Sequence, residues 1–159
     1  MNPTNKAIFG VFLFCLVVIA APFANAQEVQ KGLGPSKEEY KVGQKWSYHA
    51  RPGEEDSYLV IVKIENEPKV GTIIHVALSG LKVKNRRGRN GLTETANHLP
   101  FSKEAIDKSV LKLLKENVDL PNFEEGYRLW REAFEAKRAG IYTIPVAEAV
   151  SVMEATLNQ

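Results

Sequence analysis

The stretch SYLVIVKIENEPKVGTIIHVALSGLKVKN, residues 57–85, decides the fold. In its first part apolar side chains occupy every second position, which is the two-residue period of a strand. These positions are Tyr58, Val60, Val62 and Ile64. Turn-forming residues follow in NEPKVG, and a second alternation begins at Ile74. The pattern predicts a β-hairpin in which Glu65 lies opposite Ile73.

The apolar face of the second strand changes parity at Gly80. Before this glycine the apolar positions are Ile74, Val76 and Leu78, and after it they are Leu81 and Val83. An extra residue in one strand of an antiparallel pair restores such a face, and glycine often marks the place. The sequence therefore predicts a β-bulge at Gly80.

Two further strands flank this hairpin, and the second of them has the weaker signal. In KWSYHAR, residues 45–51, the apolar positions alternate with polar ones, and a register that pairs Arg51 with Ser57 places His49 opposite Leu59. In GLTETANHLPF, residues 91–101, the threonines favour a strand, although a glutamate interrupts one face. We therefore expect an antiparallel meander of about four strands.

The apolar period becomes helical after Pro100. Three segments follow it, and they are SKEAIDKSVLKLLKEN (102–117), PNFEEGYRLWREAFEAKRAG (121–140) and VAEAVSVMEATL (146–157). Ser102 is a suitable N-cap for the first of them. Strands followed by helices predict an α+β fold, with two or three C-terminal helices packed on one face of the sheet.

The N-terminus has the layout of a secretory signal peptide. An apolar run from Ala7 to Ala21 is shorter than the roughly 20 residues that span a membrane, and Ala24-Asn25-Ala26 suits cleavage after Ala26. We expect a signal peptide over 1–26, a flexible leader over 27–41 and one domain over 42–159. Cys15, the only cysteine, lies in the signal peptide, so the exported chain has no disulfide. This favours a periplasmic or secreted bacterial protein.

Four segments of the chain resemble a family of small exported bacterial proteins that are usually labelled hypothetical. They are KVGQKWSYHARPGEEDSYLVIVKIENE, GTIIHVALSGLKVKN, HLPFSKEAIDKSV and PNFEEGYRLWREAF. The similarity extends from about Val42 to Leu157. It implies a bacterial envelope or secreted setting, and it brings no activity, substrate or catalytic residue.

A basic decapeptide, KVKNRRGRNG at residues 82–91, is the strongest local charge. Its cations are Lys82, Lys84, Arg86, Arg87 and Arg89. The formal net charge of the chain is only +2, and no aromatic residue is interleaved for base stacking, so nucleic acid is a poor partner. Two interpretations remain open: a solvated hairpin tip, or a contact with an acidic protein or an anionic envelope component.

The residues that catalysis or metal binding needs are scarce. A metal site of His49, His75 and His98 is not expected, because the predicted register places His49 and His75 well over about 10 Å apart and no ligand motif is present. No cofactor-binding motif occurs either, so we expect no cofactor. No nucleophile elbow surrounds Ser79. The adjacent acids of residues 54–56 are interpreted as a solvated turn.

An aromatic stripe marks the second predicted helix. Its members are Phe123, Tyr127, Trp130 and Phe134. This spacing fits a core-facing helix, and a groove for a peptide or glycan is the alternative.

These observations favour a non-enzymatic exported binding module, such as an inhibitor or an immunity-type protein. The alternative is a small-ligand carrier or a hydrolytic enzyme whose site lies on the sheet face that bears His49, Arg51 and His75.

Overall fold

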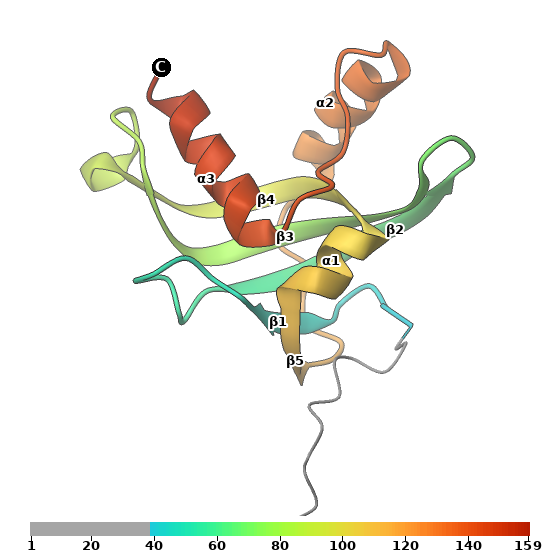
Figure 1. Ribbon diagram of the computed structural model, residues 1–159, viewed down its shortest axis with the longest axis horizontal. Helices are drawn as coiled ribbons and strands as arrows, with labels where there is room; N and C mark the ends of the chain where they lie inside the picture. Colours follow the sequence, from blue (N-terminus) through green and yellow to red (C-terminus); the bar gives the residue numbers. More distant parts are fainter. Residues whose placement is uncertain (1–38) are drawn as a thin grey trace, which may run out of the picture. The chain divides into compact units, whose positions relative to one another are not determined.

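The computed structural model describes residues 39–159, and the predicted signal peptide lies outside these residues. They form one antiparallel sheet with the strand order β4-β3-β2-β1-β5 (Figure 1). The strands are β1 (Lys45–Tyr48), β2 (Tyr58–Glu67), β3 (Gly71–Lys84), β4 (Leu92–Ser102) and β5 (Val110–Lys115). The edges of the sheet are therefore β4 and β5.

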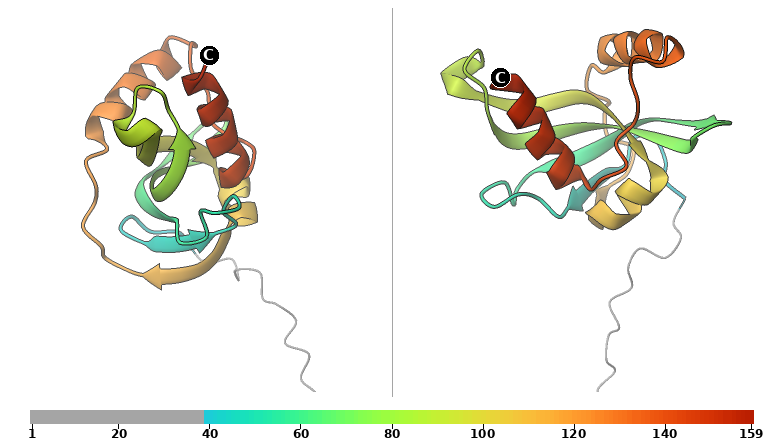
Figure 2. Two further views of the ribbon diagram at one scale, coloured as in Figure 1. Left: turned by 90° about the vertical axis from the view of Figure 1, so that its left-hand side faces the viewer. Right: turned by 45° about the horizontal axis from the view of Figure 1, so that its top comes forward.

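Three α-helices accompany the sheet, which confirms the α+β class. They are α1 (Lys103–Ser109), α2 (Glu124–Glu135) and α3 (Val146–Leu157). A 3-10 turn, Arg89–Gly91, lies in the β3–β4 connection. Both faces of the sheet are covered, because α1 and α3 pack on one face and α2 lies on the other (Figure 2).

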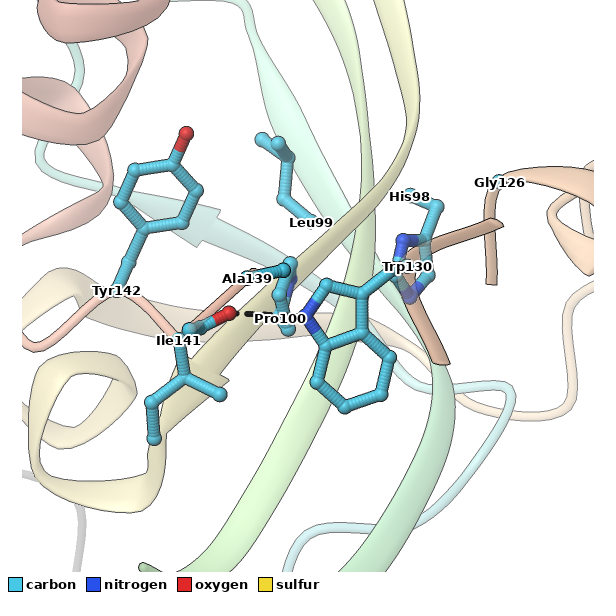
Figure 3. Close-up of a pocket in the computed structure, with 9 residues that line it drawn as sticks. His98, Leu99, Pro100, Gly126, Trp130, Ala139, Ile141 and Tyr142 are labelled. Carbon is cyan, nitrogen blue, oxygen red and sulfur yellow. Dashed lines mark hydrogen bonds between the residues drawn. The ribbon is translucent and has the colours of Figure 1, made fainter. Parts of the chain in front are cut away.

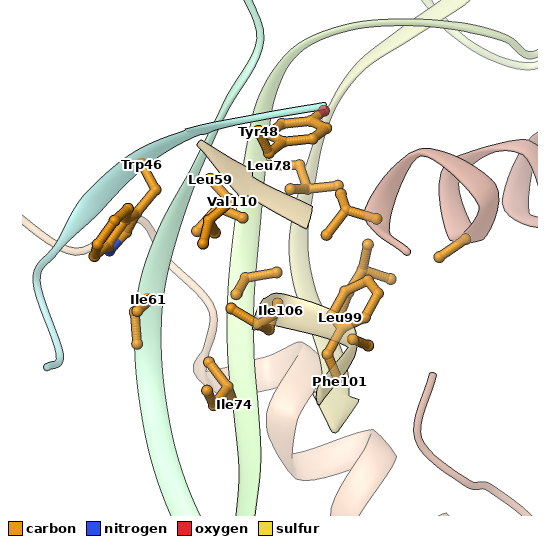
Figure 4. Close-up of a cluster of buried hydrophobic side chains, with 14 of the residues drawn as sticks. Trp46, Tyr48, Leu59, Ile61, Ile74, Leu78, Leu99, Phe101, Ile106 and Val110 are labelled. Atoms are coloured by element: carbon orange, nitrogen blue, oxygen red, sulfur yellow. The ribbon is translucent and has the colours of Figure 1, made fainter. Parts of the chain in front are cut away.

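The main hydrophobic core lies between the sheet and the helices α1 and α3 (Figure 4). Its largest fully buried side chains are Trp46, Phe101, Leu59, Ile61, Ile74, Leu78, Leu81 and Ile106. A smaller cluster of Val60, Val62 and Ala77 occupies the opposite face, where Phe123 packs against it. Both faces of the middle strands are thus buried. On the face opposite the main core, α2 covers a second and more polar region.

The predicted β2–β3 hairpin is confirmed in its register. Glu65 pairs with Ile73, and Lys63 pairs with His75. The parity change at Gly80 is confirmed as well, because this glycine has a φ of +79° and the β3–β4 register shifts there. A Cβ at Gly80 would lie 3.1 Å from the Cα of Ser57, so the residue also permits close packing.

The predicted β1–β2 register is wrong. Lys45 pairs with Val60 and Trp46 with Leu59, instead of Arg51 with Ser57. The strand ends at Tyr48, and backbone hydrogen bonds close two consecutive turns in the loop that follows. The longer loop changes which residues share a face, and His49 does not lie opposite Leu59.

The first predicted helix is right only in its first half. Ser102 caps α1 by accepting a hydrogen bond from the N–H of Ala105, as expected. The chain then leaves the helix, and Val110–Lys115 forms β5 against β1. Since VLKLLK suits a strand as well as a helix, the unpaired edge of β1 decides its conformation. Strand pairing here overrides helix propensity.

Packing begins before residue 42. Tyr40 is buried, its ring meets that of Trp46 edge to face, and its hydroxyl donates to Asp107. Tyr40, which lies in the predicted leader, therefore belongs to the core. None of the helices in residues 39–159 combines the length and apolar composition that crossing a membrane requires.

Candidate functional site

Two histidines meet between the sheet and α2. His75 lies on β3 and is fully buried, and His98 lies on the neighbouring strand β4. Nδ1 of His75 and Nε2 of His98 are 2.9 Å apart, and the two rings stack with a centroid separation of 5.0 Å. A short irregularity in the β3–β4 register, between Val76 and Leu78, lies beside this pair. Such irregularities re-aim side chains and often lie next to functional sites.

Glu65 fixes the tautomers of the two histidines. Its Oε1 lies 3.1 Å from Nε2 of His75, and its Oε2 accepts a hydrogen bond of 3.0 Å from the hydroxyl of Tyr127. A carboxylate only accepts, so Nε2 of His75 carries the proton and Nδ1 accepts from Nε2–H of His98. Nδ1 of His98 is then an acceptor, and it has no hydrogen-bond partner within residues 39–159.

Both imidazoles are held neutral. Burial and, to a smaller extent, the neighbouring His75 together lower the pKa of His98 to about 4. Burial also lowers the pKa of His75, although Glu65 opposes this shift. Aromatic rings from α2 contribute to the burial, because the ring centroids of Trp130 and Tyr127 lie 4.9 and 5.3 Å from that of His75. A protonated pair would carry two adjacent charges in a poorly solvated place.

A cavity of about 470 Å³ opens beside His98 (Figure 3). Residues of β4, α2 and the segment before α3 line it, and they are His98, Leu99, Pro100, Gly126, Trp130, Ala139, Gly140, Ile141 and Tyr142. The indole N–H of Trp130 donates to the carbonyl of Gly140 at 2.8 Å, which fixes the ring as a wall. The side chains around the cavity are mostly apolar, and His98, whose Nδ1 is an acceptor, is among them.

Gly126 allows α2 to approach β4 closely. A Cβ at this position would lie 2.8 Å from the Cβ of His98, closer than side chains tolerate. Glycine inside a helix costs about 1 kcal/mol relative to alanine. The cost is offset here by the contact that places Trp130 and His98 on the same cavity.

The predicted site face of His49, Arg51 and His75 does not form. His49 is exposed and lies in the loop after β1, whereas His75 is buried under α2. Arg51 instead pairs with Glu54 and with Glu154 of α3, on the opposite face of the sheet. The error follows from the β1–β2 register described above.

Glu54 does not lie in a solvated turn, which corrects the sequence interpretation. It is buried, and its Oε1 accepts from Arg51 and from the backbone N–H of Lys82, both at 2.6 Å. Burial raises the pKa of Glu54, but the bonds from Arg51 and Lys82 outweigh it and lower the pKa overall. This carboxylate therefore ties the 49–57 loop to the bulge of β3.

The basic decapeptide forms the β3–β4 connection. Lys82, Lys84, Arg86 and Arg87 are exposed, and none of them makes an ion pair within the described residues. Asn85 shapes the turn by accepting from the N–H of Arg87 and donating to Thr93. Arg89 begins the 3-10 turn. Four cations of the decapeptide are thus exposed beside a turn that hydrogen bonds hold in place.

The aromatic stripe is packed against the site. Tyr127, Trp130 and Phe134 are half-buried, and the ring of Phe134 lies 4.8 Å from that of Trp130. Tyr127 and Trp130 contact the histidine pair, whereas Phe123 packs against the smaller apolar cluster of Val60, Val62 and Ala77. Trp130 alone of these residues lines the cavity beside His98.

Within residues 39–159 no group of three or more histidine, cysteine or acidic side chains is arranged to hold a metal ion. Comparison of the chain with family models, with curated proteins and with solved structures gives no match.

Stability is expected to fall as the pH falls from about 6.5 towards 4. The unfolded chain takes up protons on its histidines near pH 6.5, whereas folded His98 does so near pH 4. The folded state therefore loses up to ~1.4 kcal/mol per pH unit for each proton that unfolding takes up. Urea unfolding at pH 7.0, 6.0 and 5.0 measures this slope.

His98→Asn should flatten the slope, and the exposed His49→Asn should leave it unchanged. An identical slope in His98→Asn and the wild type would contradict the assignment of the neutral pair. Glu54 does not confound the test, because its pKa is lowered from 4.5 and its contribution is lost at a lower pH.

Proposed function

We propose that residues 39–159 form a non-enzymatic binding module that takes an aromatic or apolar ring into the cavity beside Trp130. The observation that carries the proposal is the cavity itself, with the rings of Trp130 and Tyr142 in its lining and His98 as an acceptor. Its volume of about 470 Å³ falls in the range of small-molecule sites. A ring that bears an O–H or N–H group fits this chemistry.

Binding is favoured over catalysis by what lines the cavity. The lining set contains no carboxylate, no thiol and no serine or threonine hydroxyl, so its nucleophilic groups are limited to the His98 imidazole and the Tyr142 phenol. His98 is a weak base, because its pKa of about 4 lies far from neutral pH. Export and an inhibitor or immunity-type role stay predictions from the sequence.

A thermal-shift experiment tests the cavity. Indole and phenol at millimolar concentration are expected to raise the melting temperature more than toluene, which lacks a hydrogen-bond donor. Trp130→Ala should abolish the shift, because it removes a wall of the cavity. Leu129→Ala is the matched control, since Leu129 is 53% exposed on the same helix.

The proposal fails if no ring compound raises the melting temperature of the wild type. It also fails if Trp130→Ala, folded by circular dichroism, responds as the wild type does.

A further inference from the structure

The two edges of the sheet differ in how they are protected. β5 carries Lys112 and Lys115 within six residues. Two register shifts interrupt the pairing of each edge strand with its neighbour, so bulges do not distinguish the two edges and the lysines do. Lysines and bulges are the usual devices that keep an edge strand from pairing with another chain. β4 has neither lysine nor proline from Leu92 to Asn97. The β4 edge is therefore the one left open.

The outer side of β4 already accepts an extended segment at one end. Tyr142 forms a parallel bridge with Phe101, donates its N–H to Pro100 and accepts from the N–H of Ser102. Within residues 39–159 this is the outer pairing that β4 makes, because its other partner is β3 on the inner side. Glu94, Thr95 and Asn97 are exposed further along the strand. A strand could thus continue along the edge from the place where Tyr142 stops.

The cavity lies at one end of this open edge. The basic decapeptide of residues 82–91, called the basic tip below, lies at the other end. His98, Leu99 and Pro100 of β4 line the cavity, next to the segment that leaves the strand. The tip precedes Leu92, where β4 begins. From Leu92 to His98 a strand covers roughly 20 Å, at about 3.3 Å per residue. A seven-residue segment spans this distance.

The charges at the tip determine what that segment must carry. Lys82, Lys84, Arg86 and Arg87 are exposed without ion pairs in the described residues. Arginine pairs well with carboxylates, so acidic side chains complement this end. The ring-lined cavity complements an apolar or aromatic side chain at the other end.

We infer that the ligand is an extended peptide that adds a strand to the outer edge of β4 over Leu92–Asn97. It places one aromatic or apolar side chain in the cavity beside Trp130 and directs acidic side chains to the basic tip. Main-chain hydrogen bonds supply affinity in this mode, and the cavity and the tip supply specificity. The inference rests on the proposed function, because it names the ligand class of the same cavity.

To test this inference, peptides that bind the immobilised protein are selected from a display library of random twelve-residue sequences. Enriched sequences are expected to carry an aromatic or apolar residue and, about six residues away, one or more acids. A synthetic enriched peptide is then made in two forms, each N-methylated at alternate amides. One form should bind at least tenfold more weakly and the other about as well as the parent, because only alternate amides face the β4 edge.

Two double substitutions remove the same positive charge from different parts of the surface. Arg86→Ser with Arg87→Ser should weaken the peptide several-fold at low salt and less at high salt. Lys112→Ser with Lys115→Ser removes the same charge from the β5 edge and should change nothing. Trp130→Ala should abolish binding.

Failure of the inference differs from failure of the proposed function. If no peptide is enriched while indole still raises the melting temperature, the cavity serves a small molecule and the strand proposal is overturned. Peptides that bind equally well in both N-methylated forms also overturn it. If neither peptides nor indole bind, both proposals fall.

Discussion

Glu54→Gln is expected to lower the free energy of unfolding by about 3 kcal/mol, because it breaks a buried charge pair and leaves its partner less compensated. The side chain of Glu54 is 2% exposed and that of Arg51 is 18% exposed, so water replaces the lost interaction poorly. The substitution also weakens the hydrogen bond that the backbone N–H of Lys82, in the bulge of β3, donates to residue 54. Urea unfolding at pH 7 measures the change.

Asp56→Asn is the matched control for this prediction. It removes a negative charge two residues away, from an exposed side chain. Equal and small effects of the two substitutions would show that the acidic turn is solvated after all. A large effect confined to Glu54 would establish it as a structural residue that joins the 49–57 loop to β3.

Gly126→Ala is expected to destabilise the protein by about 1–3 kcal/mol, although alanine favours helices over glycine. The added methyl group would lie 2.8 Å from the Cβ of His98, so α2 must move away from β4. That movement separates Trp130 from His98 and should abolish the response to indole. Thermal unfolding with and without indole measures both effects.

Gly140→Ala serves as the control, because a Cβ at Gly140 meets nothing within 4 Å. It lies on the same cavity and should leave the melting temperature close to that of the wild type. A stabilised Gly126→Ala variant that still responds to indole would contradict the close packing of α2 on β4.

The central hairpin could be predicted from the sequence because its signal is local. Alternating apolar residues fix the period, and the turn residues between the strands fix the register. β5 could not be predicted in the same way. Residues 110–115 suit a helix or a strand, and the choice depends on the vacant edge of β1, which lies more than sixty residues away in the chain.

The site was predictable only in part, for a related reason. The correct β2–β3 register already places His75 opposite Lys63, near Glu65. Its partner is His98, because the β4 strand brings that side chain over His75, and the sequence carries no signal for this pairing beyond a weak strand. The loop of residues 49–57 moved His49 and Arg51 away from the site. The length of this loop determines where His49 and Arg51 lie, and the apolar periodicity of the sequence does not predict loop length.

The indole N–H signals of the two tryptophans test the central claim most directly. Trp130 donates to Gly140 at the cavity, and Trp46 donates to Gln44 in the main core, where it is 2% exposed. In a two-dimensional NMR titration with indole, the Trp130 signal is expected to shift progressively to saturation while the Trp46 signal stays in place. If neither signal moves, or if both move equally, the cavity beside Trp130 is not a binding site and the account is contradicted.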